Sequence, residues 1–95
     1  MAQTFTRESY DLDLLLDSIE VHPYRLIVHN DEINTFDWVI DSLIDVCKHT
    51  RLQAEQCAYI IHYKGKYTVK EGEENLLLGM RSALVERGIG ATVEG

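Results

Sequence analysis

The sequence has little basic charge, a single proline, two cysteines and no long apolar run. Nine Lys and Arg residues against sixteen Asp and Glu residues give a formal net charge of −7 at pH 7. Nucleic acid and anionic membrane surfaces repel such a chain, so we expect it to bind neither. Apolar runs such as Leu14–Leu16 and Leu76–Leu78 are far too short to span a membrane. No signal-peptide pattern opens the chain, so we expect a cytoplasmic protein.

The two cysteines do not form a CxxC pair, since Cys47 and Cys57 are ten positions apart. Cytosolic thiols are normally reduced, and we therefore expect no disulfide. Ninety-five residues that are 45% apolar suffice for one small hydrophobic core. The sequence therefore predicts one small globular domain.

The first 22 residues differ in composition from the rest. Within this segment, Leu12, Leu15, Leu16 and Ile19 recur at the i, i+3, i+4, i+7 spacing of a short amphipathic helix. Pro23 ends this pattern, because proline disfavours a helical conformation in the residue before it. We interpret residues 1–22 as an acidic N-terminal tail or short docking helix, and residues 23–95 as the core domain.

The core domain begins with a buried strand over residues 24–29, followed by polar residues and a helix that starts near Phe36. Asn34 precedes this helix and Asp37 stands three residues further on, as in a capping box. The inward stripe of the helix is predicted to be Phe36, Val39, Ile40, Leu43, Val46 and Cys47.

A second capping signature, Thr50 with Gln53, predicts another helix that ends before Gly65. Its predicted inward stripe is Ala54, Cys57, Ala58 and Ile61. A short strand over residues 66–70 follows, with Tyr67 and Val69 on one face. A third helix is predicted over residues 73–87, with Leu76, Leu77, Met80, Ala83 and Leu84 inward.

A last strand is predicted over residues 89–94, which completes the order β-α-α-β-α-β. A three-stranded sheet has an apolar face that other elements must cover. We therefore expect an α+β fold in which a three-stranded antiparallel sheet packs against three helices.

Few residues suggest catalysis or a bound cofactor. Cys57 and His62 are five positions apart on one predicted helix, which turns them about 140° from each other. They therefore cannot comfortably face one another as a catalytic cysteine and its base would. No GxSxG, HExxH or phosphate-binding glycine loop occurs. We expect no catalytic residues and no cofactor. His62, His29, Asp31 and a cysteine are types that bind zinc, but their spacing matches no paired-ligand pattern.

The stretch from Leu26 to Gly65 resembles the ClpS family, adaptors that deliver proteins with destabilising N-terminal residues to a Clp ATPase. The family pattern is a strand running into Asn-Asp-Asp, a helix that opens soon afterwards, and a later helix ending in His-x-x-Gly. The corresponding segments of this chain are Asn30-Asp31-Glu32, Asn34–Val39 and His62–Gly65.

The resemblance implies a pocket for the free N-terminus of a substrate. Asn30, Asp31 and His62 would hold the α-ammonium group. The first side chain would enter a hydrophobic slot lined by Asn34, Phe36, Val39, Ala58, Ile61 and Ile89. An ammonium group has three donors, and a carboxylate, an amide oxygen and a neutral imidazole nitrogen are suitable acceptors for them. The implied partners are a ClpA- or ClpC-like ATPase and peptides that start with Leu, Phe, Tyr or Trp. Such an adaptor needs only to be a monomer.

Several positions depart from the family pattern. Glu32 replaces an aspartate, so we do not assign it to the amine. Phe36 is bulkier than the usual methionine and Ala58 is smaller, so the preference among large first residues stays open. The Ala-Glu-Thr-Lys pattern used toward the ATPase is missing, and Glu73–Leu77 stands in that neighbourhood. These departures leave open a regulator of a Clp ATPase that does not read N-termini. The Cys and His residues leave open a third interpretation, a small metal-binding or redox domain.

Overall fold

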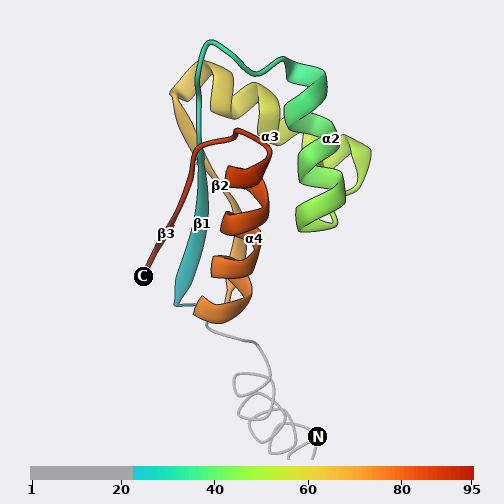
Figure 1. Ribbon diagram of the computed structural model, residues 1–95. Coiled ribbons are helices and arrows are strands. Elements are labelled where there is room, and N and C mark those ends of the chain that lie inside the picture. The colour runs from blue at the N-terminus through green and yellow to red at the C-terminus, as the bar shows by residue number, and fades with distance from the viewer. Residues whose placement is uncertain (1–22) are drawn as a thin grey trace, which may run out of the picture.

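The computed structural model describes residues 23–95, and the predicted tail or docking helix over residues 1–22 lies outside that part of the chain. The described elements are β1 (Tyr24–His29), α2 (Phe36–Cys47), α3 (Arg51–Lys64), β2 (Lys66–Gly72), α4 (Glu74–Glu86) and β3 (Ala91–Glu94) (Figure 1). This order confirms the predicted α+β fold with three strands and three helices in residues 23–95. None of these helices is long and apolar enough to cross a membrane.

β1 is the central strand of the sheet, because β2 and β3 pair with its two edges in antiparallel orientation. Leu26 of β1 lies opposite Lys70 of β2 and Val93 of β3. The register against β2 shifts between Leu26 and Ile27, and Val69 is the extra residue at this bulge. The helices lie to one side of the strands in Figure 1. The end of β1 at His29 leads directly into the loop that precedes α2.

The core lies between the sheet and the helices. Leu26 of β1, Leu43 of α2, and Leu77 and Leu84 of α4 are fully buried in it. Each such leucine contributes about 1.5–3 kcal/mol by leaving water. The buried face of α3 consists of the small and medium residues predicted from the sequence: Ala54, Cys57, Ala58 and Ile61.

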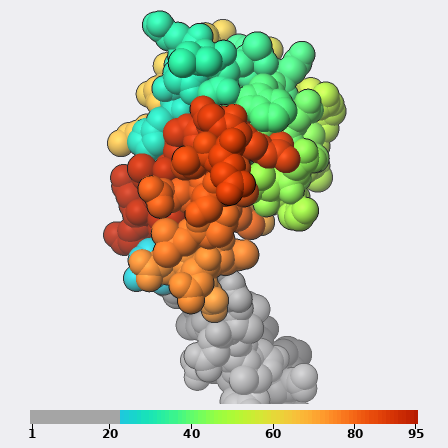
Figure 2. Space-filling view, viewed as in Figure 1, coloured from blue at the N-terminus to red at the C-terminus, as the bar shows by residue number. Residues whose placement is uncertain are grey.

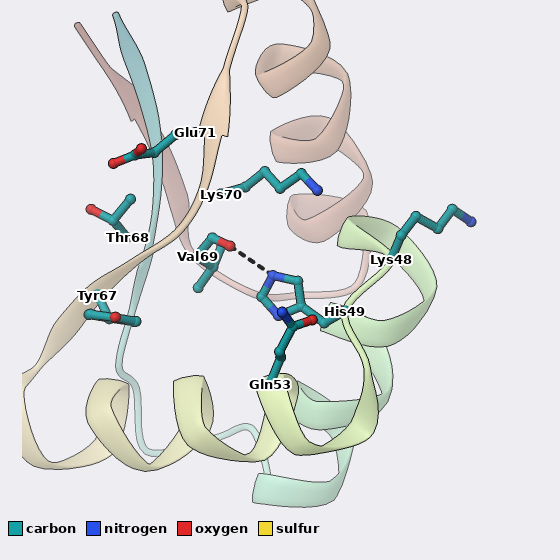
Figure 3. Close-up of a pocket in the computed structure, with 8 residues that line it drawn as sticks. All are labelled: Lys48, His49, Gln53, Tyr67, Thr68, Val69, Lys70 and Glu71. Atoms are coloured by element: carbon teal, nitrogen blue, oxygen red, sulfur yellow. Dashed lines mark hydrogen bonds between the residues drawn. The ribbon is translucent and has the colours of Figure 1, made fainter. Parts of the chain in front are cut away.

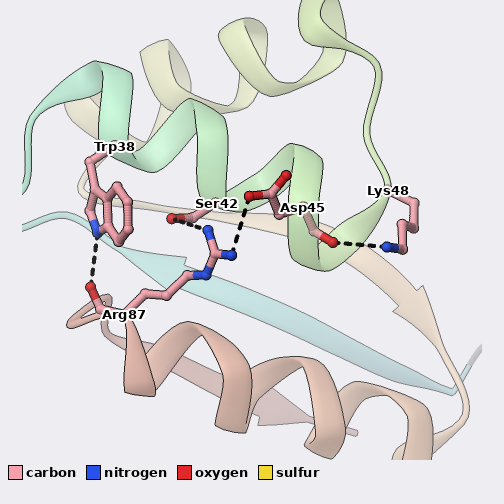
Figure 4. A network of polar contacts seen from close by, with 5 residues as sticks. All are labelled: Trp38, Ser42, Asp45, Lys48 and Arg87. Atoms are coloured by element: carbon pink, nitrogen blue, oxygen red, sulfur yellow. Dashed lines mark hydrogen bonds and ion pairs between the residues drawn. The ribbon is translucent and has the colours of Figure 1, made fainter.

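A polar network joins α2 to the end of α4. The surfaces of these two helices meet on the face shown in Figure 2. The Trp38 Nε1–H donates to the Arg87 carbonyl at 2.9 Å, and the Arg87 guanidinium lies 5.4 Å from the centre of the Trp38 ring. The same guanidinium donates to Ser42 Oγ at 3.3 Å and pairs with Asp45 at 3.2 Å (Figure 4). These contacts fix Arg87, the residue after α4, along the length of α2.

The termini of α2 and α3 show which capping predictions hold. Thr50 caps α3 in a complete capping box with Gln53, as predicted, and Gly65 ends the helix at φ 91°. The left-handed region suits glycine because it has no Cβ. The predicted cap of α2 is wrong by one residue, because Thr35 and not Asn34 accepts a hydrogen bond from the Trp38 N–H.

Two residues predicted to face the core are instead exposed. Leu76 is 51% exposed because only one face of α4 contacts the core, and that face carries Leu77 and Leu84. Phe36 is 39% exposed because it opens α2 beyond the core and lies against α3 residues at the protein surface. Of the predicted strand over residues 66–70, Val69 is buried, whereas Tyr67 is 39% exposed. The last strand begins at Ala91, later than predicted, although Ile89 is buried.

Candidate functional site

Three chain segments meet where β1 ends. The His29 N–H donates to the Gly90 carbonyl at 2.9 Å, which ties the strand to the segment between α4 and β3. The Asn30 N–H donates to the Gly65 carbonyl at 2.8 Å, which ties the next residue to the turn after α3. The polar triplet Asn30-Asp31-Glu32 is thereby placed beside the C-terminal end of α3, where His62 lies.

Asp31 organises the loop between β1 and α2. Its Oδ1 atom accepts hydrogen bonds from the Ile33 N–H at 2.8 Å and from the Asn34 N–H at 2.7 Å. Its Oδ2 atom accepts from the Asn34 side-chain amide at 2.7 Å. The bond from the Asn34 N–H is the main reason that the pKa of Asp31 lies below its usual value, and the other two bonds act in the same direction. The Asp31 carboxylate is therefore negatively charged at neutral pH.

The Asn34 side chain connects this loop to the end of α4. Besides its bond to Asp31, the Asn34 amide donates to the Gly88 carbonyl at 2.9 Å. This contact joins residues 54 positions apart in the sequence. Asn34 therefore acts as a link between two loops of the site.

A cavity of about 380 Å³ opens between this loop and α3. It brings together eight of the nine residues predicted to bind a substrate N-terminus: Asn30, Asp31, Asn34, Phe36, Val39, Ala58, Ile61 and His62. Glu32 and Thr35 also line it, and neither was assigned a binding role from the sequence. Ile89, the ninth residue, lines an adjoining hollow of about 20 Å³ that shares Asn30, Asp31, Asn34, Val39 and Ile61 with the larger cavity.

The cavity has a polar rim and an apolar wall. Ala58 and Ile61 are buried, Val39 is half-buried, and these three residues supply the apolar side. Asn30 and Glu32 are exposed at the rim, with the Asp31 carboxylate beside them. The Phe36 ring stands 5.1 Å from the His62 ring and 5.4 Å from the Tyr59 ring, measured between centroids. Such a cavity suits a ligand that carries a positive charge next to a large apolar group.

A second hollow, of about 580 Å³, lies on the other side of α3 against β2 (Figure 3). His49 Nε2 is 2.7 Å from the Val69 carbonyl oxygen, and because a carbonyl can only accept, this nitrogen carries the proton. The Lys48 and Lys70 ammonium groups donate to the carbonyls of Asp45 and Cys47 at the end of α2. These histidine and lysine side chains therefore serve local structure, and the hollow contains none of the residues predicted to bind a ligand.

Both cysteines are buried free thiols. Burial raises the pKa of Cys47 to about 11 and also raises the pKa of Cys57. Neither thiol lines the 380 Å³ cavity. Within residues 23–95, no group of three or more His, Cys, Asp and Glu side chains is arranged to hold a metal ion.

Comparisons with known proteins identify relatives of this chain. A family model described as "ATP-dependent Clp protease adaptor protein ClpS" matches residues 20–86. A protein of Oleidesulfovibrio alaskensis named "ATP-dependent Clp protease adapter protein ClpS" is 35% identical over 60 residues, which are 63% of this chain and 58% of the relative. A protein of the same name from Nitratidesulfovibrio vulgaris is 33% identical over 58 residues, which are 59% of this chain and 56% of the relative. The matches thus span less than two thirds of the length of these relatives.

Among solved structures, Agrobacterium tumefaciens ClpS2 bound to L-phenylalaninamide has a similar fold. Its TM-score is 0.69 at 19% sequence identity, and the match covers 75% of this chain and 93% of that one. The similarity agrees with the β-α-α-β-α-β order of residues 23–95.

Proposed function

This chain belongs to the ClpS family of Clp protease adaptors, and we propose that it recognises N-degrons. In this proposal, the cavity beside Asp31 binds the free α-amine and the large hydrophobic first residue of a substrate. The protein then delivers that substrate to a Clp ATPase for proteolysis. It acts as a cytoplasmic monomer that binds its substrate without transforming it.

The observation that carries the proposal is the position of one fixed carboxylate at the rim of an apolar cavity. Asp31 is held by three hydrogen bonds within its own loop, and Ala58 and Ile61 form buried apolar wall nearby. An α-amine has a pKa of about 7.7–8.0 and is mostly protonated at neutral pH. A charged acceptor beside an apolar slot therefore matches the two ends of an N-terminal residue.

The energies of the two parts are comparable. A charge-assisted hydrogen bond contributes about 1.5–3 kcal/mol. Burial of a large first side chain contributes about 1.5–3 kcal/mol more. Either part alone gives weak binding once the cost of association is included, so a useful affinity requires both parts together. The site should therefore require a free amine and a large side chain at the same time.

The solved relative supports this choice of ligand. L-phenylalaninamide, bound to Agrobacterium tumefaciens ClpS2, consists of a free α-amine next to an aromatic side chain. Asn30 and His62 line the present cavity together with Asp31, so the cavity contains the three side chains that we assign to the amine. For the delivery step, a ClpA- or ClpC-like ATPase is the partner that we propose.

The proposal is tested by fluorescence anisotropy with short peptides that differ only in the first residue. We expect peptides starting with Leu, Phe, Tyr or Trp to bind at micromolar concentration, and peptides starting with Met, Ile, Arg or acetyl-Leu to bind at least tenfold more weakly. Equal binding, or no binding, across the whole set would overturn N-terminal recognition and favour a regulator that does not read N-termini.

A matched pair of variants tests the role of the carboxylate. Asp31→Asn keeps the oxygen that accepts from the Ile33 and Asn34 N–H groups, but it removes the charge and the acceptor for the Asn34 side-chain amide. We expect about a tenfold or greater loss of affinity for the Leu peptide. Asp37→Asn makes the same chemical change at an exposed position on α2 and should leave affinity unchanged. Equal effects of the two variants would contradict a direct contact between Asp31 and the amine.

A further inference from the structure

Three exposed aromatic rings continue the wall of the candidate cavity onto the outer surface of α3. Phe36 is 39% exposed, Tyr59 is 57% exposed and Tyr63 is 76% exposed. We call these three residues the aromatic shelf. Tyr59 and Tyr63 are four positions apart on α3 and therefore lie on the same helix face.

The rings of the shelf are close enough to form one surface. The Phe36 and Tyr59 centroids are 5.4 Å apart, and the Tyr59 and Tyr63 centroids are 6.3 Å apart with an angle of 4° between the ring planes. His62 joins the two ends, because its ring lies 5.1 Å from Phe36 and 5.1 Å from Tyr63.

The core does not require these tyrosines. α3 packs on the core through its buried residues Ala54, Cys57, Ala58 and Ile61, which lie on a different face of the helix. Large aromatic side chains that remain this exposed are common at binding surfaces, where they bring much apolar area with few rotatable bonds.

Continuity with the cavity identifies what this surface binds. Phe36 belongs both to the lining of the 380 Å³ cavity and to the aromatic shelf. His62 also lines the cavity, and its ring contacts Phe36 and Tyr63 of the shelf. We propose that the aromatic shelf binds the second and third residues of the peptide whose first residue occupies the cavity. This inference rests on the function proposed above, and it adds a sequence preference beyond the first position.

The distances fit such a peptide. An extended chain advances about 3.3 Å per residue. The separation of 5.4 Å between Phe36 and Tyr59 therefore corresponds to one or two residues beyond the cavity wall. Successive side chains of an extended chain point to opposite sides, so one of the two following residues faces the rings. Aromatic side chains at these positions gain ring contacts that glycine lacks.

The test uses three peptides that share a first leucine and differ next to it: Leu-Gly-Gly, Leu-Tyr-Gly and Leu-Gly-Tyr, each with the same labelled tail. On the unmodified protein, we expect at least one tyrosine peptide to bind about three- to tenfold more tightly than Leu-Gly-Gly. Tyr59→Ala and Tyr63→Ala should reduce this advantage to less than twofold while changing Leu-Gly-Gly affinity by less than twofold.

Tyr67→Ala is the matched control, because Tyr67 is an exposed tyrosine on β2 that does not line the cavity. It should retain the full advantage of the tyrosine peptide. Thermal melting of all three variants checks that each one is folded at the assay temperature.

The possible failures are distinguishable. If all three leucine peptides bind equally and acetylation abolishes their binding, the shelf proposal is overturned and N-terminal recognition stands. If the tyrosine advantage survives in both Tyr59→Ala and Tyr63→Ala, the shelf is likewise overturned. If acetyl-Leu-Tyr-Gly binds as tightly as Leu-Tyr-Gly, both proposals fail, because binding then does not depend on a free amine.

Discussion

Asn34 contacts Asp31 twice, once through its backbone and once through its side chain. The Asn34 N–H donates to Asp31 Oδ1 and the Asn34 side-chain amide donates to Asp31 Oδ2, both at 2.7 Å. A carboxylate offers roughly four acceptor positions, and the Ile33 N–H takes a third. The carboxylate is thus fixed in the loop, and one acceptor position on Oδ2 is left for a further donor. A preorganised charge of this kind loses little freedom when it binds an ammonium group.

The link made by Asn34 can be removed by the change Asn34→Ala. This variant loses the side-chain bonds to Asp31 and to the Gly88 carbonyl, each with a net contribution of about 0.5–1.5 kcal/mol. We expect urea denaturation to show a loss of about 1–3 kcal/mol in the free energy of unfolding. Affinity for a Leu peptide should also fall, because the carboxylate is held less firmly. Asn75→Ala, at an exposed position on α4, is the control. Equal stabilities of the two variants would argue against a linking role.

The capping of α2 shows where prediction from the sequence stops. Asn34 and Thr35 are both good cap residues and stand next to each other, so the local sequence does not decide between them. In the structure, the Asn34 amide donates to the Asp31 carboxylate and to the Gly88 carbonyl, 54 positions away, while Thr35 caps the helix. By contrast, the capping box of Thr50 and Gln53 is entirely local, and it was predicted correctly.

The same reasoning separates the predictable from the unpredictable side chains. The buried face of α3 followed from helical periodicity, because the helix is covered on one side along its length. Phe36 and Leu76 fit the periodicity of their helices equally well. Phe36, however, opens α2 beyond the core, and Leu76 lies outside the face of α4 that carries Leu77 and Leu84. The meeting of Asn30, Asp31 and His62 followed from the family resemblance, since nothing in their spacing brings β1 and the end of α3 together. Their binding roles remain predictions.

The lowered pKa of Asp31 predicts a specific loss of stability in acid. The unfolded chain takes up its proton near the ordinary value of 3.8, whereas the folded protein resists protonation to lower pH. The stabilising contribution is therefore complete above that value and is lost as pH falls through the lower folded-state pKa. We expect the unmodified protein to be more stable than Asp31→Asn at about pH 6, and this difference to narrow at about pH 3. Urea denaturation at both pH values measures it. A difference that stays constant would mean that the carboxylate charge does not contribute.

The size of residue 58 should control which first residues fit the cavity. Ala58 is 3% exposed and lines the cavity, so a longer side chain at this position must project into it or displace its neighbours. Ala58→Met is expected to weaken binding of Trp peptides by about tenfold or more, because overpacking costs about 1–3 kcal/mol, and to weaken Leu peptides less. Anisotropy with the two peptides measures the ratio of affinities. An unchanged ratio would show that the first side chain lies elsewhere.

The contacts of Arg87 predict a change that can be followed by fluorescence, because Trp38 is the only tryptophan of the chain. Arg87→Ala removes the guanidinium over the Trp38 ring together with its bonds to Ser42 and Asp45. A partly exposed cation–π contact and an exposed ion pair suggest a loss of about 1–2 kcal/mol in unfolding free energy and an altered Trp38 emission. Arg87→Lys keeps the charge but not the planar fork, so its effect should be intermediate. A lysine variant as unstable as the alanine variant would mean that charge alone contributes nothing here.

Gly79 and Gly88 should respond in opposite ways to the same substitution. Gly79 lies inside α4, its φ angle is not in the left-handed region, and a Cβ atom added there meets nothing within 4 Å. Gly79→Ala is therefore expected to raise the free energy of unfolding by about 0.5–1 kcal/mol, since alanine has less backbone freedom to lose on folding. Gly88 has a φ of 81°, a conformation in which a Cβ atom is strained, so Gly88→Ala should lower stability by about 1–2 kcal/mol. Urea denaturation of the two variants measures the sign of each change in the free energy of unfolding. A destabilising effect of Gly79→Ala would contradict the inference that this position has room for a Cβ atom.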